Sequence, residues 1–158
     1  MEKLYKRDSG AVRYNEAWVE DGLLYHHWGV IGDVGEHTKR PLRAFEAKRK
    51  AISAVLSNAR TMGYMPLSLE EHAILLIEFE VEGFGTEEDL EKRHALQDRM
   101  DETLGWAGIG HCDGGSCGSG TMEVCCFVVD FEIARSLIVK DLEGTQFSDY
   151  TRIYREDG

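Results

Sequence analysis

The chain has 158 residues, of which 42% are hydrophobic and 30% are charged, and its formal net charge is −11. This composition is typical of a folded globular protein, and no run of apolar residues approaches the roughly 20 that a membrane-spanning helix requires. The length fits one domain or two small ones.

The charge is divided unevenly along the chain. Residues 1–66 contain eleven Lys and Arg against eight Asp and Glu, and residues 67–158 contain seven against twenty-one, so the two parts carry +3 and −14. Between these parts a helical pattern stops at Gly63, and Pro66 follows, as at a linker. We therefore predict two domains, residues 1–66 and residues 72–158.

The first domain begins with a hairpin pattern. Residues 11–20 and 23–31 alternate apolar and polar side chains on either side of Asp21-Gly22, which is a strong signal for a tight β-turn. A second turn at residues 32–35 precedes a short strand over residues 36–40. The first domain is thus predicted to contain a small antiparallel sheet.

Pro41 is predicted to open one long helix that ends at Gly63, a residue type suited to the C-terminal cap. Apolar side chains recur at helical spacing along one face: Leu42, Phe45, Ile52, Val55, Leu56, Ala59 and Met62. Basic side chains fall within twelve residues at the start of this segment: Lys39, Arg40, Arg43, Lys48, Arg49 and Lys50. This basic row is a candidate surface for neutralising phosphates.

The second domain has the predicted order strand, helix, strand, strand, helix, strand. Strands are predicted from residue 73, over residues 106–111 and 121–129, and over residues 147–154. Thr86 is placed to cap a helix that runs to about Leu104, and a second helix covers residues 130–142. This order is that of a ferredoxin-like split βαβ domain, so the fold class is α+β.

The first domain resembles the WGR family, small modules named after a Trp-Gly-Arg triplet in a β-strand. The resemblance covers residues 1–67 and rests on Trp28, Gly29, Gly32, Gly35, Pro41, Phe45, Ala47, Gly63 and Tyr64. It implies that Trp28 packs against nucleic acid near a strand break, as this residue does in poly(ADP-ribose) polymerases. The arginine of the triplet is replaced by Val30, which puts that contact in question.

The two histidines before Trp28 are expected on opposite faces of their strand, so His26 and His27 cannot ligate one metal ion together. A tryptophan in a hairpin is also commonly a packing residue, and a charged helix face is commonly solvated. Both interpretations of Trp28 therefore stay open.

Residues 108–120 are rich in glycine and contain His111, Cys112 and Cys117, and Cys125-Cys126 follow in the next strand. The sequence allows a zinc site at His111, Cys112 and Cys117, a Cys112–Cys117 disulfide, or a mobile hairpin loop. The cysteine spacing differs from that of the common zinc motifs. We predict no catalytic residue, no metal and no cofactor.

Three functions are compatible with these features. The first is a non-enzymatic adaptor that recognises nucleic-acid ends or a protein surface through Trp28 and the basic row. The second is an acidic inhibitor of a basic protein, and the third is a metal- or thiol-dependent enzyme. The first residues have no apolar run typical of a secretion signal, so we expect a cytoplasmic bacterial protein that forms a homodimer and has no membrane contact.

Overall fold

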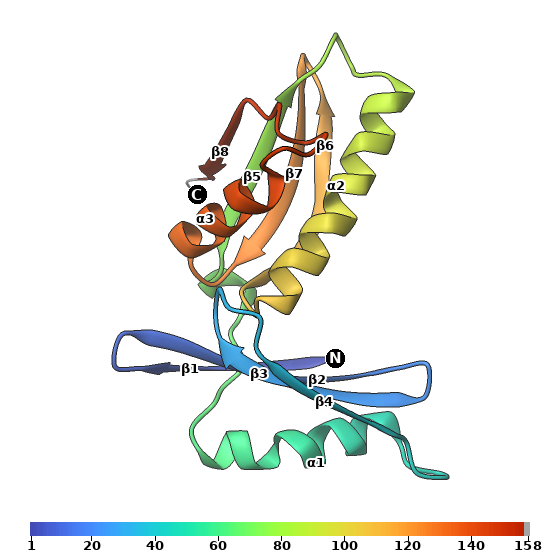
Figure 1. The fold of residues 1–158 in the computed structure, drawn as a ribbon, viewed down its shortest axis with the longest axis vertical. Coiled ribbons are helices and arrows are strands. Elements are labelled where there is room, and N and C mark those ends of the chain that lie inside the picture. Colours follow the sequence, from blue (N-terminus) through green and yellow to red (C-terminus); the bar gives the residue numbers. More distant parts are fainter. Residues whose placement is uncertain (157–158) are drawn as a thin grey trace. The chain divides into compact units, whose positions relative to one another are not determined.

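The structure is a computed structural model that describes residues 1–156. It divides into two compact units, Met1–Ser68 and Leu69–Gly158, where the sequence predicted limits at residues 66 and 72. Each unit holds one four-stranded antiparallel sheet, and the described residues form three α-helices (Figure 1). The mixed α+β class is confirmed.

The sheet of the first unit has its strands in chain order. They are β1 (Glu2–Asp8), β2 (Ala11–Glu20), β3 (Leu23–Val30) and β4 (Glu36–Pro41). Asp21 and Gly22, with φ angles of 48° and 76°, make the two-residue turn that the Asp-Gly pair predicted. The strands β2, β3 and β4 confirm the prediction, and β1 was not foreseen.

The helix of the first unit, α1 (Lys48–Thr61), begins seven residues later than predicted. Pro41 is the last residue of β4, and Phe45 lies in the turn that follows, with a φ of 63° and a fully exposed side chain. The prediction that Pro41 opens the helix is therefore wrong, and Phe45 is not part of the apolar face. Gly63 does follow the helix with a φ of 88°, as predicted.

The helix packs on one face of this sheet. Its buried side chains, Ala51, Ile52, Leu56 and Ala59, form an apolar cluster with three strand residues, Leu4, Ala17 and Leu24. Because side chains of a strand alternate between faces, the neighbouring positions Tyr14, Glu16 and His27 point to the face away from α1. The first unit thus has an apolar cluster under its helix and a buried polar cluster on the opposite face.

The second unit follows the predicted order of elements. Its elements are β5 (Ala73–Glu80), α2 (Glu87–Trp106), β6 (Gly110–Gly118), β7 (Thr121–Val128), α3 (Phe131–Leu142) and β8 (Arg152–Arg155), preceded by a short 3-10 turn at Leu69–Glu71. The strands lie side by side in the order β6-β7-β5-β8, and each neighbouring pair is antiparallel.

Three details of the second unit differ from the prediction. Trp106 ends α2 and does not begin a strand, since Thr86 and Asp89 form a capping box that starts a 20-residue helix. The glycine-rich residues 110–118 form strand β6, with a bulge between Cys112 and Gly115, and not a long mobile loop. The last strand is shorter than predicted and begins at Arg152.

The core of the second unit lies between its sheet and the two helices. Along β7 every second side chain is buried, and these side chains face those of Leu96, Met100 and Leu104 from α2 and Ala134, Ile138 and Leu142 from α3. Ile133, on the other side of α3, is exposed. This core contains apolar side chains and one disulfide.

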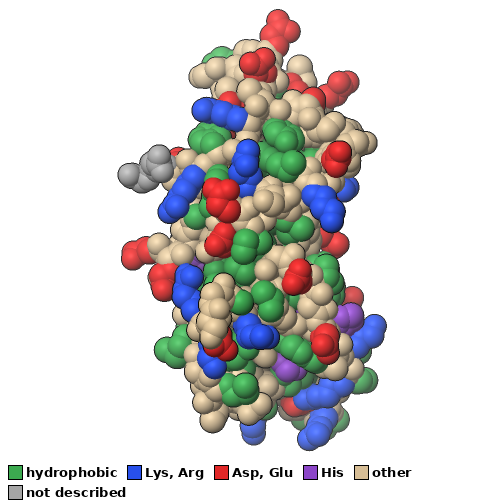
Figure 2. Space-filling model, turned by 60° about the vertical axis from the view of Figure 1, so that its left-hand side comes forward, with side chains coloured by type: hydrophobic (Ala, Val, Ile, Leu, Met, Phe, Trp, Pro, Cys, Tyr) green, Lys and Arg blue, Asp and Glu red, His purple; other side chains and the backbone are tan. Residues whose placement is uncertain are grey.

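None of the described helices is long and apolar enough to cross a membrane. On the face drawn in Figure 2, acidic and basic side chains are interspersed with hydrophobic ones. Any charged binding site must therefore be identified from local groups of residues.

Candidate functional site

A polar cluster lies on the face of the first sheet that points away from α1. The Tyr14 hydroxyl is 2.8 Å from His27 Nε2, and His27 Nδ1 is 2.7 Å from Glu16 Oε1. Lys3 Nζ lies 2.9 Å from the other oxygen of Glu16, and the Gly35 N–H donates to the Tyr14 hydroxyl at 3.0 Å. Tyr14, His27 and Glu16 expose 0%, 1% and 3% of their surface.

The protons of this cluster can be assigned from its acceptors. The Glu16 carboxylate only accepts, so the His27 Nδ1–H donates to Glu16 Oε1, and the Tyr14 hydroxyl and His27 Nε2 share the second hydrogen bond. Burial is the main reason that the pKa of Tyr14 rises to about 12, so its hydroxyl stays protonated at neutral pH. The cluster resembles a catalytic relay in composition, but its groups are sealed and satisfied by one another, which favours a structural role.

Two glycines that follow Trp28 make room for this cluster. A Cβ atom at Gly35 would lie 2.1 Å from the Trp28 carbonyl oxygen and 2.3 Å from the Tyr14 hydroxyl. A Cβ atom at Gly29 would lie 2.9 Å from the Gly35 Cα and 3.0 Å from the same hydroxyl. The glycines after Trp28 are therefore explained by the close approach of the chain to Tyr14.

Trp28 lies on the other face of the sheet, the one that carries α1, and its indole is partly exposed. The His26 ring lies beside it, with 4.6 Å between ring centroids, and a 2.8 Å hydrogen bond to Asn15 Oδ1 fixes that histidine. Burial and the neighbouring His27 lower the pKa of His26, so the ring beside Trp28 is neutral at pH 7. His26 and His27 thus point to opposite faces, as predicted.

The predicted basic row does not form one continuous surface. Lys39 lies opposite Tyr25 in the β3–β4 register and shares the face away from α1. Arg40 is bound by Glu46 through two 2.9 Å hydrogen bonds, and this pairing together with the Arg43 backbone N–H lowers the pKa of Glu46 to about 2. Lys39 is therefore on the wrong face for a ligand at Trp28, and Arg40 is already neutralised by Glu46.

The other four cations of the row remain close together in sequence and exposed. They are Arg43, Lys48, Arg49 and Lys50. None of these four side chains has an ion-pair partner within residues 1–156. Arg43 precedes α1, and the other three form its first turn. The start of α1 is thus a local concentration of positive charge without acidic partners among the described residues.

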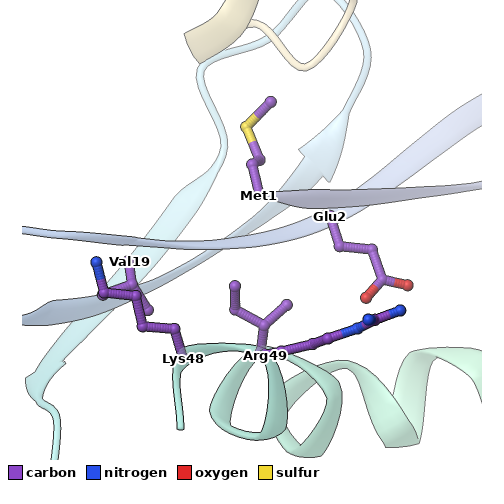
Figure 3. Close-up of a pocket in the computed structure, with 6 residues that line it drawn as sticks. Met1, Glu2, Val19, Lys48 and Arg49 are labelled. Carbon is purple, nitrogen blue, oxygen red and sulfur yellow. The ribbon is translucent and has the colours of Figure 1, made fainter.

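An open groove of about 550 Å³ lies at this end of the helix. It is lined by Met1, Glu2, Val19, Lys48, Arg49 and Ile52 (Figure 3). Glu2 is paired with Arg60, so Lys48 and Arg49 leave the groove with a positive balance. In Figure 3, Lys48 extends on the side of Val19 and Arg49 on the side of Glu2.

The groove and Trp28 lie at different places along the same side of the sheet. Val19, in the groove, pairs with Leu24 of β3, and Trp28 is four positions further along that strand. Four positions correspond to about 13 Å. The predicted site is therefore divided into a cationic groove and a separate aromatic surface.

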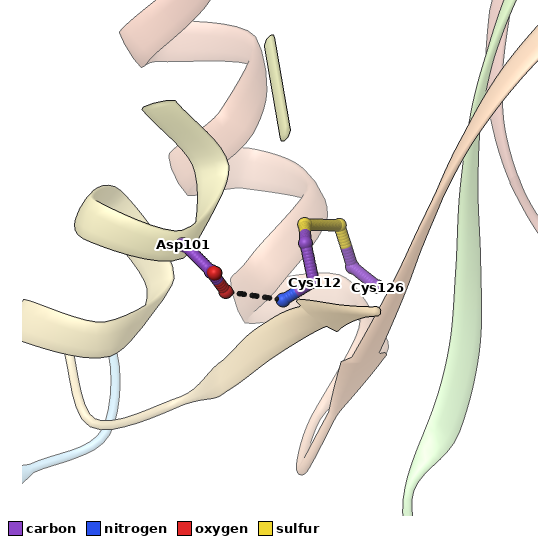
Figure 4. The surroundings of a disulfide bond; sticks show 3 residues. All are labelled: Asp101, Cys112 and Cys126. Carbon is purple, nitrogen blue, oxygen red and sulfur yellow. Dashed lines mark hydrogen bonds between the residues drawn. A yellow bond between two sulfur atoms is a disulfide. The ribbon is translucent and has the colours of Figure 1, made fainter. Parts of the chain in front are cut away.

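The cysteine-rich segment holds a disulfide where the sequence allowed a metal site. Cys112 lies opposite Cys126 in the β6–β7 register and forms a disulfide with it, beside the 2.7 Å hydrogen bond from the Cys112 N–H to Asp101 Oδ1 (Figure 4). The alternative Cys112–Cys117 disulfide does not form, since Cys112 pairs with Cys126 and the Cys117 thiol donates to the Phe84 carbonyl oxygen.

His111 also fails to join the two cysteines in a ligand set. It is adjacent to Cys112 in β6, so its side chain points to the opposite face of the sheet. In the part of the chain that the structure describes, no three His, Cys, Asp or Glu side chains are grouped as a metal would require. The zinc alternative has no geometric support there.

Sequence reasoning missed Tyr14 and Glu16. A usable signal exists, because the two-residue turn at Asp21-Gly22 fixes the hairpin register and thereby places Glu16 opposite His27. The role of Gly35 could not be found in this way, since it depends on how the chain after β3 folds back over Tyr14.

Comparison of the chain with protein-family models, with curated proteins and with solved structures finds no match. The function must therefore be argued from the site itself.

Proposed function

We propose that this protein is a non-enzymatic binding or regulatory adaptor whose first unit, a WGR-like module, recognises nucleic-acid ends. The observation that carries the proposal is the group of four cations at the start of α1, on the side of the sheet where Trp28 is partly exposed; none of them has an ion-pair partner within residues 1–156. Neutralising phosphates with such groups releases counterions and drives binding to nucleic acid.

The spacing of the two parts suits a nucleic-acid strand. Phosphates of one B-form strand follow each other at about 3.4 Å, so the separation of about 13 Å between the groove and Trp28 corresponds to roughly four nucleotides. A base at a strand end can stack on the indole of Trp28 while the preceding phosphates meet Lys48 and Arg49. A neutral His26 beside the indole adds a second ring to that surface.

The net charge of −11 does not oppose this local contact at ordinary ionic strength. At physiological salt the Debye length is about 8 Å, so charges of distant residues are screened at the groove. The first part of the chain, residues 1–66, is itself positive by three charges.

For the second unit we propose a ferredoxin-like domain without catalytic function. Taken by their order along the chain, its strands β5, β6, β7 and β8 lie as 2-3-1-4, which supports the split βαβ assignment. Two of its reactive groups are already engaged, since Cys112 is joined to Cys126 and Glu78 is paired with Arg152.

The proposal is tested by measuring affinity for nicked and single-stranded DNA as a function of salt. We expect Lys48→Gln/Arg49→Gln to weaken binding and to reduce the slope of log K against log salt by about 0.7 to 0.9 for each phosphate that the variant no longer neutralises. Trp28→Ala is expected to weaken binding to strand ends roughly ten- to hundred-fold with an unchanged salt slope.

The matched control is Arg7→Gln/Lys39→Gln, which removes two exposed cations on the face away from α1, neither of which has an ion-pair partner among residues 1–156. It should leave binding nearly unchanged. Equal losses of DNA affinity in both double variants would show that binding depends on total charge and not on the groove, and would refute the assigned site. Absence of binding to either DNA at about 50 mM salt would refute the proposal altogether.

A further inference from the structure

The most exposed aromatic side chain of the second unit is held on a structured loop. Phe84, 84% exposed, lies between β5 and α2. The Gly120 N–H donates to the Gly83 carbonyl at 2.7 Å, and the Cys117 thiol donates to the Phe84 carbonyl at 3.3 Å. Both donors belong to the β6–β7 hairpin, so the loop is tied to the sheet and presents the ring to solvent.

Acidic residues precede and follow Phe84 along the chain. Glu82, Glu87 and Glu88 are exposed, and no cation among residues 1–156 forms an ion pair with them. Asp89, in contrast, is engaged in the helix cap with Thr86. We refer to Phe84 with Glu82, Glu87 and Glu88 as the acidic knob. It combines one apolar anchor with negative charge, the pattern of an anchor residue in a binding surface.

The groove of the first unit has the complementary character. Val19 and Ile52 give it an apolar floor, Lys48 and Arg49 give it a positive rim, and its volume of about 550 Å³ is large enough for an aromatic side chain. Neither the rim of the groove nor the acids of the knob have ion-pair partners among the described residues. Complementary charge of this kind selects partners and accelerates their encounter.

We propose that the acidic knob of one copy of this chain docks into the cationic groove of a second copy. The Phe84 ring then covers Val19 and Ile52, and the glutamates face Lys48 and Arg49. The two surfaces differ, so the contact is heterologous, and an assembly of any length keeps one free knob at one end and one free groove at the other. The association therefore adds further copies with rising concentration and weakens with salt.

The test is sedimentation velocity of the full-length protein across a concentration series without nucleic acid. We expect the wild-type protein to show a mass that increases with concentration up to about 200 µM at about 20 mM salt, and to become monomeric at about 0.5 M salt. Phe84→Ser, which lacks the anchor, and Lys48→Glu/Arg49→Glu, which reverses the rim, are each expected to remain monomeric at low salt.

Mixing the two variants gives the decisive result. The Phe84→Ser protein retains its groove and the Lys48→Glu/Arg49→Glu protein retains its knob, so an equimolar mixture should form a heterodimer that cannot extend further. Arg7→Glu/Arg13→Glu, the matched charge reversal outside the groove, should associate as the wild type does. Far-ultraviolet circular dichroism of each variant establishes that it is folded.

A wild-type protein that stays monomeric at all concentrations at low salt overturns the proposal, as does a folded mixture that forms no heterodimer. Glu87→Lys/Glu88→Lys provides an independent check, because it should abolish self-association and restore it when mixed with Lys48→Glu/Arg49→Glu. These measurements contain no DNA, so their failure is distinguishable from failure of the nucleic-acid proposal.

Discussion

The sheet of residues 1–68 buries polar groups on the face away from α1, whereas the sheet of residues 69–158 buries apolar side chains and a disulfide under its helices. In the first, Tyr14, His27 and Glu16 satisfy one another through hydrogen bonds of 2.7 and 2.8 Å. In the second, the residue opposite Cys112 is Cys126, which is fully buried. Both sheets have four antiparallel strands, so neither the number of strands nor their direction of pairing causes the difference.

The two kinds of interior respond differently to small changes. A buried polar cluster suffers a full desolvation penalty when one partner is misplaced, because the remaining donor or acceptor is left without water. An apolar core is weakened in proportion to the apolar surface that is removed, and it can relax in part. The first unit should therefore be the more sensitive of the two to single substitutions near its cluster.

The largest effect is expected for Gly35→Ala in the first unit. The added Cβ would lie 2.1 Å from the Trp28 carbonyl oxygen and 2.3 Å from the Tyr14 hydroxyl, so the chain must move and the Gly35 N–H must leave Tyr14. We expect a loss of more than about 3 kcal/mol in unfolding free energy, measured by urea denaturation.

Gly105→Ala in α2 is the control for Gly35→Ala, since nothing lies within 4 Å of its Cβ position. It should leave stability unchanged or raise it by about 0.5 to 1 kcal/mol, because alanine favours a helix. A Gly35→Ala protein as stable as the wild type would show that Gly35 does not need to contact Tyr14.

The second prediction concerns the cross-link of the second unit. Cys112→Ala/Cys126→Ala opens a loop of sequence separation 14, and removal of a disulfide with a loop of this size costs about 3 kcal/mol. The loss of stability should appear in the melting curve of the full-length protein followed by far-ultraviolet circular dichroism, as a transition of the second unit at lower temperature. In a Trp106→Phe background, indole fluorescence comes from Trp18 and Trp28 alone and should melt as before.

Cys125→Ala is the control for this pair, because Cys125 is a free, half-buried thiol on the opposite face of β7. It should melt close to the wild type. An equal fall in the two variants would mean that packing of the strand, and not the cross-link, stabilises the second unit.

The parts of this fold that the sequence predicted are those governed by local chemistry. The Asp21-Gly22 turn, the Thr86 cap and the Gly63 helix end each depend on a few neighbouring residues. The errors arose where a distant contact overrides a local pattern. The helical spacing of Leu42 and Phe45 suggested a helix from Pro41, but Glu46 binds Arg40 of β4 and holds the segment as a turn.

The candidate site shows the same division. The basic row was visible in the sequence, but its separation into Lys39 on one face, a neutralised Arg40 and the groove residues Lys48 and Arg49 is set by strand register and pairing. Glycine content suggested a loop at residues 108–120, but β7 provides a partner strand and imposes pairing on Gly110–Gly118. Composition alone does not contain these contacts.

The smallest effect is expected from pH. Burial raises the pKa of Tyr14 to about 12, above the value of about 10 for an unfolded tyrosine, so the folded state retains this proton after the unfolded state has lost it. The stability contributed by the protonated hydroxyl is complete below pH 10 and decreases as the pH rises toward 12. We therefore expect the unfolding free energy of the first unit to fall over this range. Indole fluorescence in the Trp106→Phe background measures this fall.

Tyr14→Phe separates this contribution from that of other groups. The variant is less stable at pH 7, because His27 Nε2 and the Gly35 N–H lose their partner, but its stability should fall less steeply between about pH 10 and 12. Burial is also the main cause that raises the pKa of Tyr5, and this residue is present in both proteins. Parallel alkaline slopes for the two proteins would mean that the Tyr14 hydroxyl ionises as easily in the folded chain as in water, and that the polar cluster is open to solvent.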